Sequence, residues 1–367
     1  MDYYLIYSAG GGGGEWNGLQ RIWKTRVKEE LKSHILIKFG DIFFNHENVG
    51  KTLNKPVLWN NLNDTRQWIY DDTNDEYVLN SSNIILDSGT AKAVSWIASH
   101  YSELESHHFI LRFDEIAEEC GLLEKYVKVV NASKIDLAVT LDIPNPFKVR
   151  ASSNTSLNLI ETDDNLPFIE VMAKYANKLY KMLDGDKKDR LLTIINGQWT
   201  KEEFNVFIEK LDYSPKNIAV GALSALRGRT FTEAIKEINK FNLCQFDRVH
   251  FLGCGGMEKV KILKENGYGD TKFSVDCSTP INRSFADRIS KYYIYGSNKK
   301  IEVSESSKTE ILKLNEKATN PYYSQQQLTK ILDLVINHQN GEHTPETFDA
   351  RAMLMLHNSD VFRQNAI

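Results

Sequence analysis

Short, continuous runs of apolar residues recur along the chain and alternate with segments of helical periodicity. Continuous hydrophobicity is typical of strands that are buried on both faces, as in parallel sheets. From residue 84 onward such runs cover residues 84–86, 137–141, 191–195, 218–220, 249–252 and 273–275. Helical periodicity covers residues 113–130, 168–183, 201–211, 231–241 and 257–266. Six or more strand–helix units favour an α/β fold of the (β/α)8 TIM-barrel type over an open doubly wound sheet.

Both ends of the chain add to this repeat. Residues 3–7 and 35–39 are strand candidates, with a basic amphipathic helix expected over 19–31. The glycine run 10–14 lies between them, and we interpret it as a loop because the Gly-Lys-Ser/Thr ending of a phosphate-binding loop is absent. Beyond residue 283 we expect strands at 292–295 and 299–303, a loop at 304–320, and helices at 325–338 and 345–363. The predicted organisation is an N-terminal segment that belongs to the barrel (1–60), a TIM-barrel core (61–300) and a C-terminal helical extension packed on it (301–367).

Composition narrows the class of protein. The 367 residues are 41% hydrophobic and 26% charged, as in ordinary soluble domains, and no apolar run reaches the roughly 20 residues of a membrane span. The start of the chain has no features of a secretion signal, so we expect a cytoplasmic protein without a membrane partner. The net charge of −4 argues against a broadly basic surface, although it allows a local basic groove. Four cysteines without C-x-x-C spacing, and no H-E-x-x-H pair, predict neither a bound metal nor a cofactor.

The residues that end the predicted strands carry the candidate chemistry. These ends begin at Asp87, Asp142, Asn196, Gly221, Gly253 and Asp276. In a TIM barrel all such ends meet at one face, where active sites lie. Aspartate and glycine also terminate strands for purely structural reasons, so each position alone has both interpretations. A carboxylate at the end of a buried strand is costly unless it is paired. Three aspartates, one asparagine and two glycines at six strand ends on one face together favour a site.

Seven short motifs, in order along residues 84–363, resemble those of the tRNA-guanine transglycosylase family, the queuine and archaeosine tRNA-ribosyltransferases. Residues 85–89 (ILDSG) resemble its L-x-D-S-G-G-F-Q motif, and 195–197 (ING) resemble V-Q-G. Residues 219–223 (AVGAL) resemble A-V-G-G-L, and 251–255 (FLGCG) resemble Y-L-M-G-V-G. Residues 275–280 (VDCSTP) resemble F-D-C-V-x-P, and 356–358 (LHN) resemble the end of its last helix. Asp142, within 140–144 (TLDIP), stands where the family places a base-binding aspartate.

The resemblance implies a base-exchange reaction and assigns the residues that perform it. Asp276 would be the nucleophile that forms a covalent aspartyl–sugar intermediate, and Asp87 the general acid/base. The base would be bound by Asp142, Asn196, Gly197, Gly221, Ala222, Leu223, Leu252 and Gly253. Flanking phosphates would be contacted by Asn282, Arg283, Arg288, Arg227 and Arg229, each of which also has a simple interpretation as solvated surface.

The departures from the family pattern point to a particular branch. The family's C-x-C-x-x-C…H zinc site is absent, since residues 315–342 contain no cysteine. Asn196 replaces glutamine, Ala222 replaces the second glycine, and the arginine after the nucleophile motif is displaced by one position to Arg283. These differences favour the zinc-less, DNA-modifying branch of phages and bacterial genomic islands, which would act in the host cytoplasm if phage-encoded.

The expected partners are therefore a nucleic acid, DNA rather than tRNA, and a free 7-deazaguanine base of the preQ0 type. The resemblance allows a homodimer. Three alternatives stay open at this point: a tRNA transglycosylase without zinc, a nucleoside hydrolase on the same barrel, and a non-catalytic accessory subunit.

Overall fold

A computed structural model describes residues 1–7, 18–19, 21–22, 26–38, 83–90, 94, 106–119, 121–132, 135–145, 164–286 and 288–366. The glycine run 10–14 lies outside these residues. So does most of the segment between the second and third predicted strands.

Eight parallel strands close into a barrel in the order of the sequence, with the first strand paired to the last. They are β1 (Asp2–Tyr7), β2 (His34–Lys38), β3 (Asn83–Asp87), β4 (Leu137–Val139), β5 (Leu191–Asn196), β6 (Asn217–Gly221), β7 (Arg248–Phe251) and β8 (Phe273–Asp276). The prediction of a TIM barrel is confirmed, and all eight predicted apolar runs are its strands. Burial on both faces explains their continuous hydrophobicity, since every residue of β6 is buried.

The strand register fixes which side chains share the interior of the barrel. Tyr4 of β1 is level with Asp276 of β8, and His250 of β7 is level with Ser274. Residues at i and i+2 of a strand point to the same face, so Ser274 and Asp276 share one face of β8. The register therefore places His250 beside both residues.

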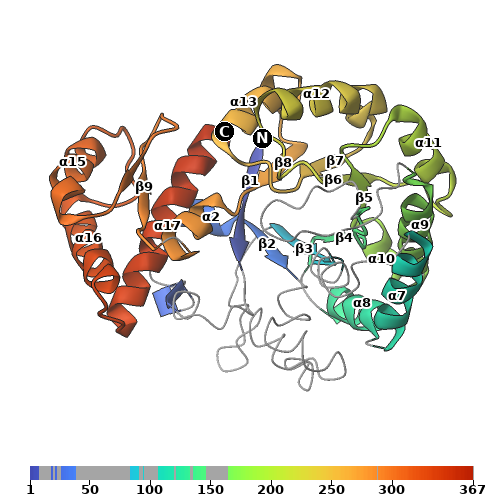
Figure 1. The fold of residues 1–367 in the computed structure, drawn as a ribbon, viewed down its shortest axis with the longest axis horizontal. Helices are drawn as coiled ribbons and strands as arrows, with labels where there is room; N and C mark the ends of the chain where they lie inside the picture. Colours follow the sequence, from blue (N-terminus) through green and yellow to red (C-terminus); the bar gives the residue numbers. More distant parts are fainter. Residues whose placement is uncertain are drawn as a thin grey trace.

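Helices surround the barrel in a ring (Figure 1). They include α2 (Glu29–Lys32), α7 (Ser106–Glu119), α8 (Leu122–Ala132), α9 (Leu166–Met182), α10 (Gly185–Lys188), α11 (Lys201–Glu209), α12 (Gly228–Ile238) and α13 (Met257–Glu265), with 3-10 turns at η1 (Asn239–Phe241) and η2 (Leu243–Gln245). The prediction of one helix over 113–130 was wrong, because Gly121 adopts a φ of +59° and separates α7 from α8. Part of the predicted 19–31 helix lies outside the described residues, and the short helix α2 overlaps the end of that range.

The chain after β8 forms a lobe beside the barrel. It contains α14 (Thr279–Ile281), the π-helical turn η3 (Asn282–Ala286), the antiparallel pair β9 (Lys291–Tyr293) and β10 (Lys300–Glu302), α15 (Glu305–Glu316), α16 (Gln325–Gln339) and α17 (Pro345–Ala366). Figure 1 shows α17 between the barrel and the outer elements α15, α16 and β9. The last helix therefore joins the lobe to the barrel.

One segment of this lobe differs from the sequence prediction. Residues 304–320 were expected to form a loop, but they contain α15. Ser304 caps this helix, because its hydroxyl accepts the backbone N–H of Ser307. Ile311 and Asn315 supply its buried face, which is too small to give a strong periodic signal.

Candidate active site

The carboxylate of Asp276 lies at the end of β8 and is 4% exposed. Its Oδ1 accepts a hydrogen bond of 2.7 Å from the backbone N–H of Gly253. The same oxygen lies 3.1 Å from Nε2 of His250, a side chain that is fully enclosed in the barrel. Among the described residues, Oδ2 has no hydrogen-bond partner. One oxygen of the carboxylate is thus held by two donors, and the other is available to a ligand.

Gly253 is suited to this role by its backbone conformation. Its φ of +68° lies in the left-handed region, and a Cβ atom there would stand 2.7 Å from the Cβ of Ser224. The sequence predicted that Gly253 would contact a base, but its N–H is directed at the carboxylate of Asp276. Leu252, the other base-binding candidate of this loop, is partly buried, and its backbone N–H bonds to Val220.

Two further carboxylates lie close to each other, at the ends of β3 and β4. Burial, together with the negative charge of Asp87, raises the pKa of Asp142 to about 7. The two loops are tied together, because the hydroxyl of Thr90 donates to the backbone carbonyl of Asp142 over 2.6 Å. The backbone N–H of Gly89, at φ +66°, donates to Oδ1 of Asp87 over 3.3 Å. A carboxyl that is about half protonated near neutral pH, beside a second carboxylate, is an arrangement found at functional sites.

Gly221 at the end of β6 leaves room for the carboxyl group of Asp142. A Cβ atom at this position would lie 3.3 Å from Oδ2 of Asp142. Asn196, level with Gly221, accepts the backbone N–H of Gln198 at Oδ1 over 2.9 Å. No described residue accepts from its Nδ2, so the amide group retains two donors for a ligand. Gly197 packs so tightly that a Cβ atom would clash with the side chain of Leu223 at 2.7 Å.

Ala222 adopts a left-handed conformation with φ of +60°. This is the position at which the resembling motif has a glycine. An alanine in this region carries strain of the order of 1 kcal/mol. Gln198 holds the loop, since its side-chain amide donates to the carbonyl of Ala222 over 2.7 Å. Backbone strain of this kind concentrates at functional loops.

The predicted phosphate-binding residues occupy two segments. Asn282 and Arg288 are exposed and Arg283 is half-buried, all in or just after η3, which follows β8. Arg229 is 90% exposed and pairs with Glu233 of its own helix. Arg227 precedes α12 as its N-cap residue. The first group leads directly away from Asp276 along the chain, whereas Arg229 has the environment of a surface ion pair.

Two residues of the site were missed in the sequence. Lys259 of α13 is half-buried, and its ammonium group donates to the carbonyls of Leu223 and Ser224 at 2.8 Å each. Burial lowers its pKa, although the nearby Cys254 raises it. His250 is the other missed residue. The sequence did contain a signal for it. His250 stands two residues before Leu252, a predicted base-binding residue, and residues at i and i+2 of a strand point to the same face.

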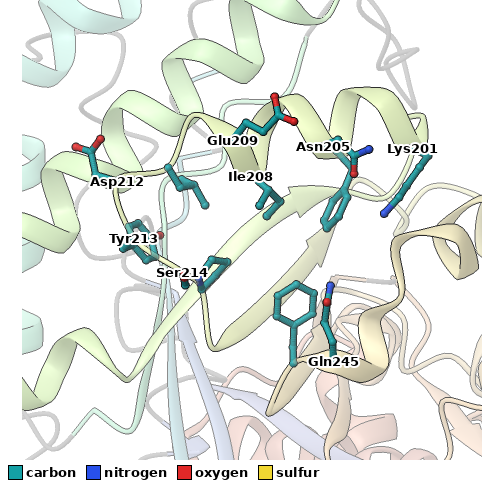
Figure 2. Close-up of a pocket in the computed structure, with 12 residues that line it drawn as sticks. Lys201, Asn205, Ile208, Glu209, Asp212, Tyr213, Ser214 and Gln245 are labelled. Carbon is teal, nitrogen blue, oxygen red and sulfur yellow. The ribbon is translucent and has the colours of Figure 1, made fainter.

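A separate groove lies on the helical layer and not among these strand ends. Figure 2 shows side chains of α11 on one wall and Gln245 on the other. The groove also includes Asp212, Tyr213 and Ser214, which lie between α11 and β6. Its lining contains none of the predicted site residues.

Within the described residues, no three histidine, cysteine, aspartate or glutamate side chains are grouped so that they could hold a metal ion. No helix of the described part of the chain is both long and apolar enough to cross a lipid bilayer.

The closed parallel barrel therefore brings Asp276, with His250 and Gly253, to the same face as the pair Asp87 and Asp142. Comparison with protein-family models and with curated proteins gave no match for the chain.

Proposed function

We propose that the protein is a base-exchange transglycosylase, which replaces guanine in a nucleic acid with a 7-deazaguanine base. The proposal rests on one observation: the three aspartates at the strand ends have different environments. Asp276 has one oxygen restrained and the other open, and Asp142 shares its surroundings with Asp87. Retention of configuration at a sugar requires a nucleophile and a separate proton-transfer group, which such a set can supply.

In the proposed reaction, Oδ2 of Asp276 attacks the anomeric carbon C1′ of the target nucleotide. A C1′–O bond forms while the C1′–N9 bond breaks, and its electron pair leaves with the guanine. The pair Asp87 and Asp142 holds one proton before the reaction. In the reactive form that proton is on Asp87, which donates it to the departing purine, and Asp142 is ionised. The incoming base then gives a proton to Asp87 and attacks C1′ from the side that guanine left, and Asp276 is released as a carboxylate.

The base itself would be recognised by Asp142 and Asn196. An ionised Asp142 accepts two N–H groups from the edge of a guanine-like base, and the free Nδ2 of Asn196 donates to a purine acceptor. Gly221, Ala222 and Leu223 contribute backbone groups beside this edge, and Leu252 an apolar contact. A base without the matching groups would leave buried polar atoms unpaired, which is how such a pocket discriminates.

The substrate must present its base outside a duplex stack, either flipped out or in a single strand. We favour DNA over tRNA because the chain lacks the cysteines of the zinc site that characterises the tRNA enzymes of the resembling family. Arg283 and Arg288 follow the nucleophile strand closely enough in sequence to contact a flanking phosphate. Arg227 would approach from the loop after β6.

The test is exchange of radiolabelled guanine into duplex DNA or bulk tRNA by the full-length protein. We expect label in DNA, and a covalent protein–DNA adduct on a denaturing gel. Asp276→Asn should reduce both by at least about 10³-fold, since the nucleophile is lost.

Asp212→Asn is the matched control, because Asp212 pairs with Lys181 on the surface and its loss should leave exchange unchanged. If only tRNA became labelled, the substrate would be tRNA and not DNA. Undiminished exchange by Asp276→Asn would refute the assignment of the nucleophile.

A further inference from the structure

We infer that His250 is a positioning residue for Asp276: it fixes the carboxylate so that Oδ2 faces the sugar, and it donates a hydrogen bond to the carboxylate as that group leaves. The inference rests on the proposed function, in which Asp276 is the nucleophile. No motif of the sequence pointed to this histidine.

The surroundings of His250 hold its ring in one orientation. The side chain is 1% exposed, and both ring nitrogens have partners on β8. Nδ1 lies 2.9 Å from the hydroxyl of Ser274, and Nε2 lies 3.1 Å from Oδ1 of Asp276. Tyr4 packs its ring edge-to-face against the imidazole, with centroids 5.3 Å apart. The ring therefore bridges two residues of the same strand face and has no room to turn.

These contacts determine which ring nitrogen carries the proton. An ionised Asp276 has only acceptor atoms, so Nε2 must be the donor in the His250–Asp276 bond. In a neutral imidazole Nδ1 is then an acceptor, and the hydroxyl of Ser274 donates to it. The hydroxyl of Ser274 can donate or accept, and by donating it satisfies Nδ1 in the tautomer that Asp276 requires.

The consequence for the reaction lies in the two oxygens of Asp276. His250 and Gly253 both bond Oδ1, so Oδ2 is the oxygen with a free lone pair to form the C1′–O bond. In the second step the C1′–Oδ2 bond breaks, and its electron pair returns to the carboxylate. The returning negative charge spreads over both oxygens. At Oδ1 it is stabilised by the hydrogen bonds from His250 and Gly253, which are already in position. Preorganised donors at a site of developing charge are an effective means of lowering a barrier.

Three variants of the full-length protein test this role in the guanine-exchange assay, with thermal unfolding measured for each. His250→Phe keeps the ring and removes the donor, and we expect kcat to fall about 10²-fold with KM for the nucleic acid unchanged. His250→Gln keeps an N–H near the position of Nε2 and should remain within about tenfold of wild type. His34→Phe is the matched control, since His34 of β2 also contacts the ring of Tyr4 but bonds Ser33 and Asn83 and not Asp276. It should exchange guanine within about threefold of wild type.

Nitrogen-15 NMR of the histidines provides a readout that does not need turnover. We expect His250 protonated at Nε2 and unprotonated at Nδ1, with Ser274→Ala weakening this preference. Protonation at Nδ1 alone would overturn the inference, as would His250→Phe at wild-type rate or His250→Gln as slow as His250→Phe. A wild-type protein that shows the expected tautomer but labels neither DNA nor tRNA would instead refute the proposed function.

Discussion

At the scale of single residues, the candidate site contains a buried carboxyl group whose ionisation is unfavourable. The carboxyl group of Asp142 is buried next to the negative charge of Asp87, and its pKa is raised to about 7. In the unfolded chain the same group titrates near 3.8. Between these values the folded protein binds a proton that the unfolded chain has already released, so this group lowers stability progressively as pH rises from about 4 to 7.

Replacing Asp142 with asparagine should therefore stabilise the protein at alkaline pH while it abolishes the proposed base exchange. We expect the free energy of unfolding at pH 8 to increase by about 2–3 kcal/mol, a value discounted for the partial exposure of the side chain. The gain should vanish near pH 4, where Asp142 is protonated in both states. Urea denaturation of both proteins across this range measures the effect. A gain that is equal at pH 4 and pH 8 would mean that the carboxyl group is not under electrostatic stress.

At the scale of elements, the sequence predicted the strands well because each is a buried run with little polar content. It predicted the strand ends of the candidate site for the same reason, since Asp87 and Asp276 terminate such runs directly. It could not reveal the partners of those residues. The contact between His250 and Asp276 depends on the register of β7 and β8, and α15 depends on a cap by Ser304 more than on periodicity.

In the last helix, α17, the sequence again predicted burial but not the polar partners. The sequence predicted a C-terminal extension packed on the barrel, and Leu354, Met355 and Leu356 of its last helix are fully buried. The same helix also buries Arg351, whose guanidinium donates to the carbonyls of Ser284 and Phe285 in η3, at 2.8 and 2.5 Å. It therefore holds the turn that follows β8.

Arg351→Met should destabilise the protein by about 2–4 kcal/mol, because the two carbonyls in η3 lose a charged donor in a buried setting. Arg21→Met provides the control, since Arg21 pairs with Asp349 of the same helix in an exposed setting. That loss should cost less than about 1 kcal/mol. Chemical denaturation of both variants makes the comparison. Equal losses would show that the contacts of Arg351 with η3 contribute no more than a surface ion pair.

At the scale of the whole molecule, α17 holds the elements of the C-terminal lobe together through buried polar groups. Asn358 accepts the backbone N–H of Tyr293 in β9 over 3.0 Å, and its amide donates to the hydroxyl of Ser284 in η3 over 3.1 Å. His357, beside it, lies 2.9 Å from the carbonyl of Tyr293 through Nε2, and its ring stacks on Tyr292. Strand β9 and the turn η3, which follows β8, thus depend on one buried cluster.

This cluster predicts a specific sensitivity to acid. Burial lowers the pKa of His357 to about 4, and no group of the described residues hydrogen-bonds to its Nδ1. Since the unfolded histidine titrates near 6.5, its contribution to stability is complete above that pH and is lost as pH falls toward 4, by on the order of 3 kcal/mol. His357→Gln carries no such titration, so the stability difference between wild type and this variant should shrink by that amount from pH 7 to pH 4. His108→Gln, at an exposed site, should follow wild type at every pH. Urea denaturation across the pH range provides the measurement, and a constant difference would mean that the buried ring does not take part in acid unfolding.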